Sequence, residues 1–217
     1  MRRVFVPVAF VHAVLVPVLA AGTAVAQPAV DQDNLLPAFF FGGAIIREVG
    51  RAQTFTVGLG GTLTSVDLQL WRSPSTPLPD VTFTLLGTTP LGFPDPANVL
   101  ATRTIPITSI PESTFIPDPP FPPITVDLAA DMIPVQPGEV YAIALTRAGL
   151  GSPPWVLWGS SGGESYAGGN GYFIQPNGQG WQIGDADFGF RTVVNVPAPG
   201  AAVFAGLLFA PLARRRR

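Results

Sequence analysis

Proline and glycine recur along the whole chain, and they limit the secondary structure that it can form. The 217 residues include 25 Pro and 24 Gly. Inside a helix, Gly costs about 1 kcal/mol and Pro about 3 kcal/mol relative to Ala. No stretch of the body keeps an apolar period of 3.6 residues, and the alternation is by twos instead. Four Trp, three Tyr and fifteen Phe argue against disorder. The pattern therefore favours short strands joined by loops.

Two segments show this alternation most clearly. Large apolar residues alternate with Ser, Asp and Gln along 63–71, and with small alanines along 140–145. The remaining candidate strands are 52–58, 81–87, 99–107, 124–129, 155–160, 171–175 and 187–195. Short strands at spacings of roughly ten residues predict an all-β fold, an antiparallel β-sandwich. Among its topologies we favour a jelly-roll-like arrangement.

The N-terminus has the three parts of a secretory signal peptide. A basic pair at residues 2–3 precedes an apolar core over 4–21, and Ala24-Val25-Ala26 stands before Gln27. Small residues at Ala24 and Ala26 form the pattern that signal peptidase reads. An N-terminal membrane anchor is the alternative, but it needs no such cleavage pattern. We therefore expect signal peptidase to remove residues 1–26 and to leave Gln27 as the first residue.

The C-terminus carries a second apolar segment with a basic end. Residues 196–213 would span ~27 Å as a helix, close to a ~30 Å hydrocarbon core. A cluster that should stay cytoplasmic follows: Arg214, Arg215, Arg216 and Arg217. The sequence thus predicts a short transmembrane helix that holds the body, residues 27–195, outside the inner membrane.

A Pro motif, an apolar helix and an Arg cluster in this order resemble the PEP-CTERM sorting signal of Gram-negative bacteria that secrete exopolysaccharide. The Pro motif is Val196, Pro197, Ala198 and Pro199, and Ala198 stands where that family commonly has Glu. The resemblance implies an exosortase-type sorting enzyme as a partner over residues 196–217. It also implies transient anchoring in the inner membrane, with delivery to the cell envelope or the extracellular matrix. A plain C-terminal anchor is the alternative.

Charge and composition exclude several function classes for the body. Two of the twelve Arg lie in the leader and four at the C-terminus, so residues 27–195 carry six Arg, fourteen acids and a net charge of −8. So acidic a body should not bind nucleic acid by counterion release. The only His is His12, which would be removed with the signal peptide, and the chain has no Cys or Lys. The body therefore contains no His, Cys or Lys. Without these side chains a His/Cys zinc site, a thiolate nucleophile and a Schiff base are all excluded, so we expect no enzyme activity.

The body also resembles a family of exported bacterial β-sandwich domains of the "choice-of-anchor" type, which often precede such C-terminal signals. The segments that carry this resemblance are 31–34, 52–58, 61–68, 166–169 and 187–192. It implies a carbohydrate-binding-like sandwich and defines no ligand.

Five aromatic residues stand in a Gly- and Ser-rich part of the chain and suggest a sugar-binding surface: Trp155, Trp158, Tyr166, Tyr172 and Trp181. Exposed rings suit sugar faces because they combine apolar area with a polar edge. In the competing interpretation, Trp158 and Trp181 fill the core and Tyr166 anchors a turn, since large aromatics are usually buried.

Calcium is a second ligand that the body could bind, because several of its residues supply hard oxygen ligands. Asp31, Asp33 and Asn34 lie near one end of the body, and Asp185 and Asp187 near the other. If the first and last strands pair, these oxygen ligands would come together. Short-range Asp pairs are also common in turns.

Polysaccharide binding without catalysis is the function that we favour. A structural matrix protein with no small ligand is the alternative, and a glycosidase built on two carboxylates is a third hypothesis.

Overall fold

The computed structural model describes residues 26–39, 41–45, 50–74, 78–117, 119–148, 155–163, 165–174 and 180–198. Within these ranges the chain forms fourteen strands, two short 3₁₀ turns (Ile107–Ser109 and Ala129–Asp131) and no α-helix. Every strand pairs with its neighbours in antiparallel fashion. The prediction of an all-β fold with antiparallel sheets is therefore confirmed. Ala24, Pro199 and Arg214 to Arg217 lie outside the described residues.

The first sheet joins the two ends of the body. It has the order β1-β14-β4-β8, and β9 continues the edge beside β4. Gln27 in β1 is paired with Val196 in β14, so the first and last strands lie side by side. The strand bounds are β1 (Gln27–Asp33), β14 (Phe190–Val196), β4 (Gly61–Leu68), β8 (Ile124–Asp127) and β9 (Ile133–Val135).

The second sheet is the larger layer. Its order is β13-β12-β3-β10-β6-β7, and β10 lies at its centre between β3 and β6. The strand bounds are β13 (Trp181–Ile183), β12 (Gly171–Ile174), β3 (Arg51–Thr56), β10 (Val140–Arg147), β6 (Val81–Thr88) and β7 (Pro94–Ile105).

A third, small sheet extends the first one at the end away from Gln27. It has the order β2-β11-β5, with bounds Phe41–Ile45, Val156–Ser160 and Leu70–Arg72. Only Gln69 separates β4 from β5, and its buried amide exchanges two hydrogen bonds with the backbone of Leu36, of 2.8 and 3.0 Å. The predicted single strand over 63–71 is therefore two strands. Among the described residues, no helix is long and apolar enough to cross a membrane.

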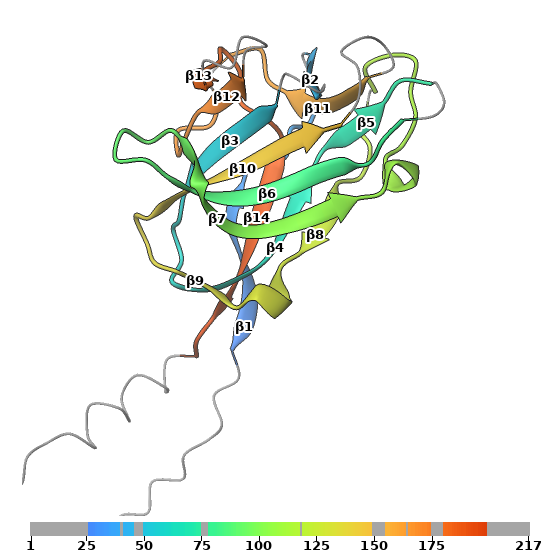
Figure 1. Cartoon of the computed structure of the whole chain (residues 1–217). Coiled ribbons are helices and arrows are strands. Elements are labelled where there is room, and N and C mark those ends of the chain that lie inside the picture. The colour runs from blue at the N-terminus through green and yellow to red at the C-terminus, as the bar shows by residue number, and fades with distance from the viewer. Residues whose placement is uncertain are drawn as a thin grey trace, which may run out of the picture.

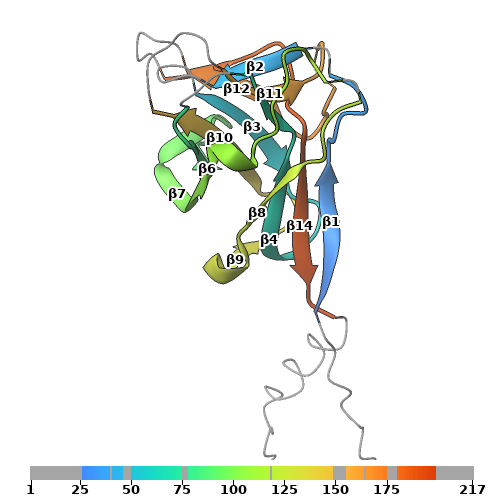
Figure 2. The same ribbon diagram turned by 90° about the vertical axis from the view of Figure 1, so that its right-hand side faces the viewer.

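The core lies between the first two sheets, which face each other as two layers (Figures 1 and 2). Phe55 of β3 and Phe190 of β14 meet across this gap, with ring centroids 5.9 Å apart. Both rings are fully buried, and each contributes roughly 1.5–3 kcal/mol of hydrophobic stabilisation. The chain has no Cys, so noncovalent packing of this kind holds the layers together.

The two ends of the molecule differ in what they carry. The start of β1 and the end of β14 lie together at one end, whereas β2, β11 and the β12–β13 hairpin lie at the other (Figures 1 and 2). A site at the second end thus lies at the opposite end of the domain from the start of β1 and the end of β14.

Candidate functional site

Trp158, the first of the predicted sugar-binding residues, is part of the core. Its side chain is 0% exposed, and its ring stacks on Phe188 with centroids 4.7 Å apart. The indole Nε1 donates a hydrogen bond of 2.9 Å to the carbonyl of Gly189. Trp158 therefore offers no ring face to a ligand, as the core-filling interpretation predicted.

The two tyrosines of the predicted sugar-binding surface also make their contacts within the protein. The hydroxyl of Tyr166 donates to Gln32 Oε1 at 2.6 Å, and its ring meets Phe190 edge-on. Burial, aided by the nearby charges of Asp31 and Asp187, raises the pKa of Tyr166. Tyr172 is 3% exposed, and its hydroxyl donates to the carbonyl of Gly92 at 3.1 Å.

The two remaining tryptophans lie in different places. Trp181 is partly buried against the small apolar cluster that contains Tyr172. Trp155 is 41% exposed and precedes β11, where its backbone N–H donates to Ser73 Oγ at 2.8 Å. The structure therefore does not assemble the five aromatic residues into one surface, because the alternation of the strands turns most of them inward.

The four predicted calcium ligands also lie in different places and make different contacts. Asp31 Oδ1 accepts hydrogen bonds from the N–H groups of Gly58 (2.8 Å) and Leu59 (2.6 Å). Asp33 forms an ion pair of 2.8 Å with Arg191. Although β1 and β14 do pair, no group of three or more acidic side chains is placed to share a metal ion within the ranges described. The calcium site stays a prediction, and the described acidic side chains do not lie together as a set of ligands.

Asp187, the third of these acids, holds a loop in place. It is 1% exposed, and its Oδ2 accepts hydrogen bonds from the N–H groups of Ser165 (2.7 Å) and Tyr166 (2.8 Å). Its Oδ1 accepts a third hydrogen bond, of 3.1 Å, from Gln53 Nε2. Such a buried carboxylate with several N–H donors stabilises the local structure.

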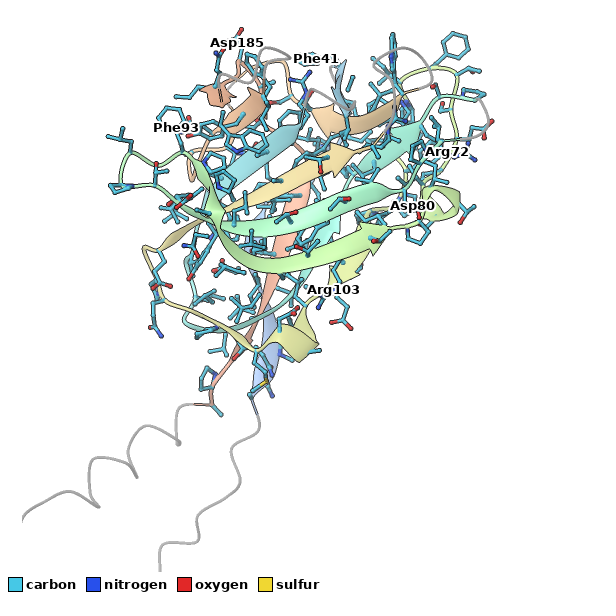
Figure 3. The ribbon with its side chains drawn as sticks, viewed as in Figure 1. Phe41, Arg72, Asp80, Phe93, Arg103 and Asp185 are labelled. Atoms are coloured by element: carbon cyan, nitrogen blue, oxygen red, sulfur yellow. The ribbon has the colours of Figure 1, made fainter. Side chains whose placement is uncertain are left out.

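Asp185, the fourth, lies in a different setting at the end of the molecule that carries β2 and the β12–β13 hairpin. It is exposed and borders a hollow of about 340 Å³, which we call the end pocket. Residues 41–43 of β2, Arg51 of β3 and residues 172–173 of β12 form its walls, together with residues 184–186 and Phe188. Figure 3 shows Phe41 and Asp185 at this end, away from Arg103.

Arg51 places a cation in the wall of the end pocket. It is paired with Phe173 in the neighbouring strand, so both side chains leave the same face of the sheet, and the guanidinium carbon lies 5.7 Å from the centre of the Phe173 ring. Its Nε donates to the carbonyl of Ala44 at 3.1 Å. Burial lowers the pKa of Arg51 from its ordinary value, although an arginine stays charged at neutral pH.

Gly43 allows Phe188, in the wall of the end pocket, to pack closely against β2. A Cβ atom at residue 43 would lie 2.4 Å from Phe188 Cε1 and 3.3 Å from Arg51 Nε. The glycine therefore lets Phe188 and Arg51 pack directly against the backbone of β2.

Phe41 completes the pocket with an apolar ring that is 40% exposed. The site thus combines aromatic area, a guanidinium and the exposed carboxylate of Asp185. Arg51 and Asp185 do not form an ion pair with each other. This combination suits a polar ligand with apolar ring faces.

Sequence reasoning found Asp185 and Tyr172 but missed Phe41 and Arg51. One signal was available in the segment Arg51-Ala52-Gln53-Thr54-Phe55. Strand alternation puts Arg51 on the same face as the core residue Phe55, and a charged residue on an inward face marks the place where the core opens. The chain matches no model of a known protein family and no curated protein sequence.

Proposed function

We propose that this chain is an exported, C-terminally sorted, non-enzymatic β-sandwich protein of the cell envelope or exopolysaccharide matrix, and that it binds polysaccharide in the end pocket. The observation that carries the binding proposal is the pocket itself. An exposed aromatic ring, a cation and an exposed carboxylate border one hollow there.

The size and chemistry of the end pocket support a sugar ligand. Its volume of about 340 Å³ lies at the lower end of the range for small-ligand sites, about 300–1,000 Å³. A pocket of this size suits a chain end or a side branch of a polysaccharide. Phe41 and Phe173 offer apolar area to the ring face, whereas Arg51 donates and Asp185 accepts hydrogen bonds from hydroxyl groups.

The order of the strands supports a jelly roll as the form of the sandwich. Eight strands of the two large sheets follow along the chain as β1, β3, β4, β6, β7, β8, β10 and β14. Numbered one to eight in this sequence, they have the spatial orders 1-8-3-6 and 2-7-4-5. These are the orders expected when a long antiparallel hairpin of strands rolls into two Greek keys.

Binding without catalysis is favoured over a glycosidase. Glycosidases use two carboxyl groups, about 5–9.5 Å apart. Of the acids in the described ranges, Asp185 alone lines the end pocket. A body without His, Cys or Lys also lacks the usual alternative bases and nucleophiles.

The position of the chain ends supports the sorting part of the proposal. β1 begins at Gln27, the residue that signal peptidase would leave first, and β14 ends at Val196, the first residue of the Pro motif. A body held to the inner membrane through residues 196–217 would carry the end pocket on its far side. Such an orientation would leave the pocket accessible to polysaccharide.

Retention on insoluble exopolysaccharide from the producing cells tests the binding. The protein should be used in the form that the cells export, together with its Phe41→Ala and Phe115→Ala variants. Phe115 is 81% exposed and does not line the end pocket, so it is the matched control. Phe41→Ala should weaken retention by about tenfold or more, since burying a Phe ring is worth roughly 1.5–3 kcal/mol. Phe115→Ala should bind like the unchanged protein.

Equal retention of both variants would contradict the pocket. No retention of any form would favour the structural matrix protein. Mass spectrometry of the protein from the medium and from membranes tests the sorting, because processing predicts Gln27 as the first residue and loss of the Arg cluster.

A further inference from the structure

Arg51 has no acidic partner among the described residues. Arg72, Arg103 and Arg191 each form an ion pair, with Glu112, Asp131 and Asp33 respectively. Arg51 forms no ion pair with a described residue, although it is partly buried in the wall of the end pocket. Buried charges are normally paired, because removing an unpaired charge from water costs several kcal/mol.

The hydrogen bonds of Arg51 leave one side of the guanidinium available. Nε is held by the carbonyl of Ala44, which fixes the plane of the group. Its two terminal nitrogens make no hydrogen bond to any residue in the described ranges. The planar fork of donors on these nitrogens matches the two oxygen atoms of a carboxylate.

We propose that the end pocket recognises an acidic sugar, a uronic acid unit, with Arg51 binding the sugar carboxylate while the sugar ring packs on Phe41. This inference rests on the proposed function, because it names the class of sugar that the same pocket would take. The proposed interaction is binding alone, with no covalent bond of the sugar formed or broken.

The remaining charges decide how specific such a preference would be. The body carries a net charge of −8, so acidic polymers are repelled at long range and should not attach without a specific cation. Asp185 is the one carboxylate among the described pocket residues, and it is exposed, so water and salt screen it. The partly buried Arg51 is screened less. A preference for acidic sugar should therefore depend on this one side chain.

Calorimetric titration with two matched pairs of probes tests the inference. The first pair of probes is oligogalacturonate and its full methyl ester, which keeps the sugar rings and removes the charge. The second pair is oligomannuronate and its ester. The protein in the form that the cells export is compared with its Arg51→Gln and Arg103→Gln variants. Arg103 lies on β7 away from the end pocket and is the matched control (Figure 3).

We expect at least one acid to bind about 10- to 100-fold more tightly than its ester, the range for a hydrogen-bonded charge. Arg51→Gln should lower the affinity for the acid to that for the ester, and Arg103→Gln should preserve the difference. Arg51→Lys, which keeps the charge and loses the fork, should retain part of the preference. It replaces the Gln variant if that variant is unstable.

The failures can be told apart. If acid and ester bind equally, or if the preference survives Arg51→Gln, the acidic-sugar inference is overturned while the proposed function stands. If neither the four probes nor the exopolysaccharide of the producing cells is bound, both proposals fail.

Discussion

Replacing Asp187 by Asn should destabilise the protein, because one buried carboxylate accepts three hydrogen bonds there. Asn keeps an acceptor for the N–H groups of Ser165 and Tyr166, at 2.7 and 2.8 Å in the unchanged protein, but loses the charge. Its NH₂ group would face the donor Nε2 of Gln53, now 3.1 Å from Oδ1. Gln53 has no easy alternative orientation, since its Oε1 accepts from the N–H of Phe188.

The expected loss is about 2–4 kcal/mol, from one lost hydrogen bond to a charged group and two weakened ones. For a domain of this size that corresponds to a fall in Tm of roughly 5–15 °C. Circular dichroism during heating measures it on the purified protein, in calcium and in EDTA. Asp127→Asn is the control: the exposed Asp127 accepts one backbone hydrogen bond, of 2.8 Å from Ala129, so its Tm should fall by only a few degrees.

The measurements in calcium and in EDTA separate two roles for Asp187, as an acceptor of protein hydrogen bonds or as a calcium ligand. If Asp187 acts only through its protein hydrogen bonds, the Tm difference is the same with and without calcium. A variant as stable as the unchanged protein would refute the reasoning from the three hydrogen bonds. A difference that appears only in calcium would instead favour the predicted metal site.

Two further perturbations probe the fold. Burial, together with the hydrogen bond to Glu139 and its charge, raises the pKa of Tyr141 to about 12, against about 10 in the unfolded chain. The stabilisation that the protonated Tyr141 hydroxyl gives is therefore complete below about pH 10 and is lost as the pH rises towards 12. The free energy of unfolding, measured by urea unfolding, should fall less steeply over this range in Tyr141→Phe than in the unchanged protein. An equally steep fall in both proteins would contradict this. Gly43→Ala should cost about 1–3 kcal/mol, because the new Cβ would lie 2.4 Å from Phe188 Cε1. A Tm equal to that of the unchanged protein would show that Phe188 moves aside freely.

Segments with clear alternation could be predicted as strands, and weakly patterned ones could not. All nine predicted segments contain strands, including 140–145 within β10 (Val140–Arg147). The missed strands are β1, β2, β9 and β13. Their sequences, such as Phe41-Gly42-Gly43-Ala44-Ile45, carry too few large residues for a period of two to emerge. They pair because neighbouring strands offer free backbone groups, which local sequence does not record.

The candidate site was harder to predict than the strands. The cluster of aromatics along 155–181 was visible in the sequence, but a period of two says only that residues alternate between faces. It does not say which face is covered. Trp158 was turned into the core by the pairing of β11 with β5 and β2, whereas Trp155 stayed 41% exposed. The sequence pattern did not indicate a role for Arg51, because single charged residues are common at the start of a strand.

The sequence by itself determined the all-β class, the net negative charge of residues 27–195 and the absence of His, Cys and Lys from these residues, because composition and short-range alternation are local properties. Tertiary structure alone decided that β1 pairs with β14, and that Phe41, Arg51, Phe173 and Asp185 border one pocket. These residues lie up to 144 positions apart in the chain. Their meeting depends on the packing of whole sheets, which no short stretch of sequence encodes.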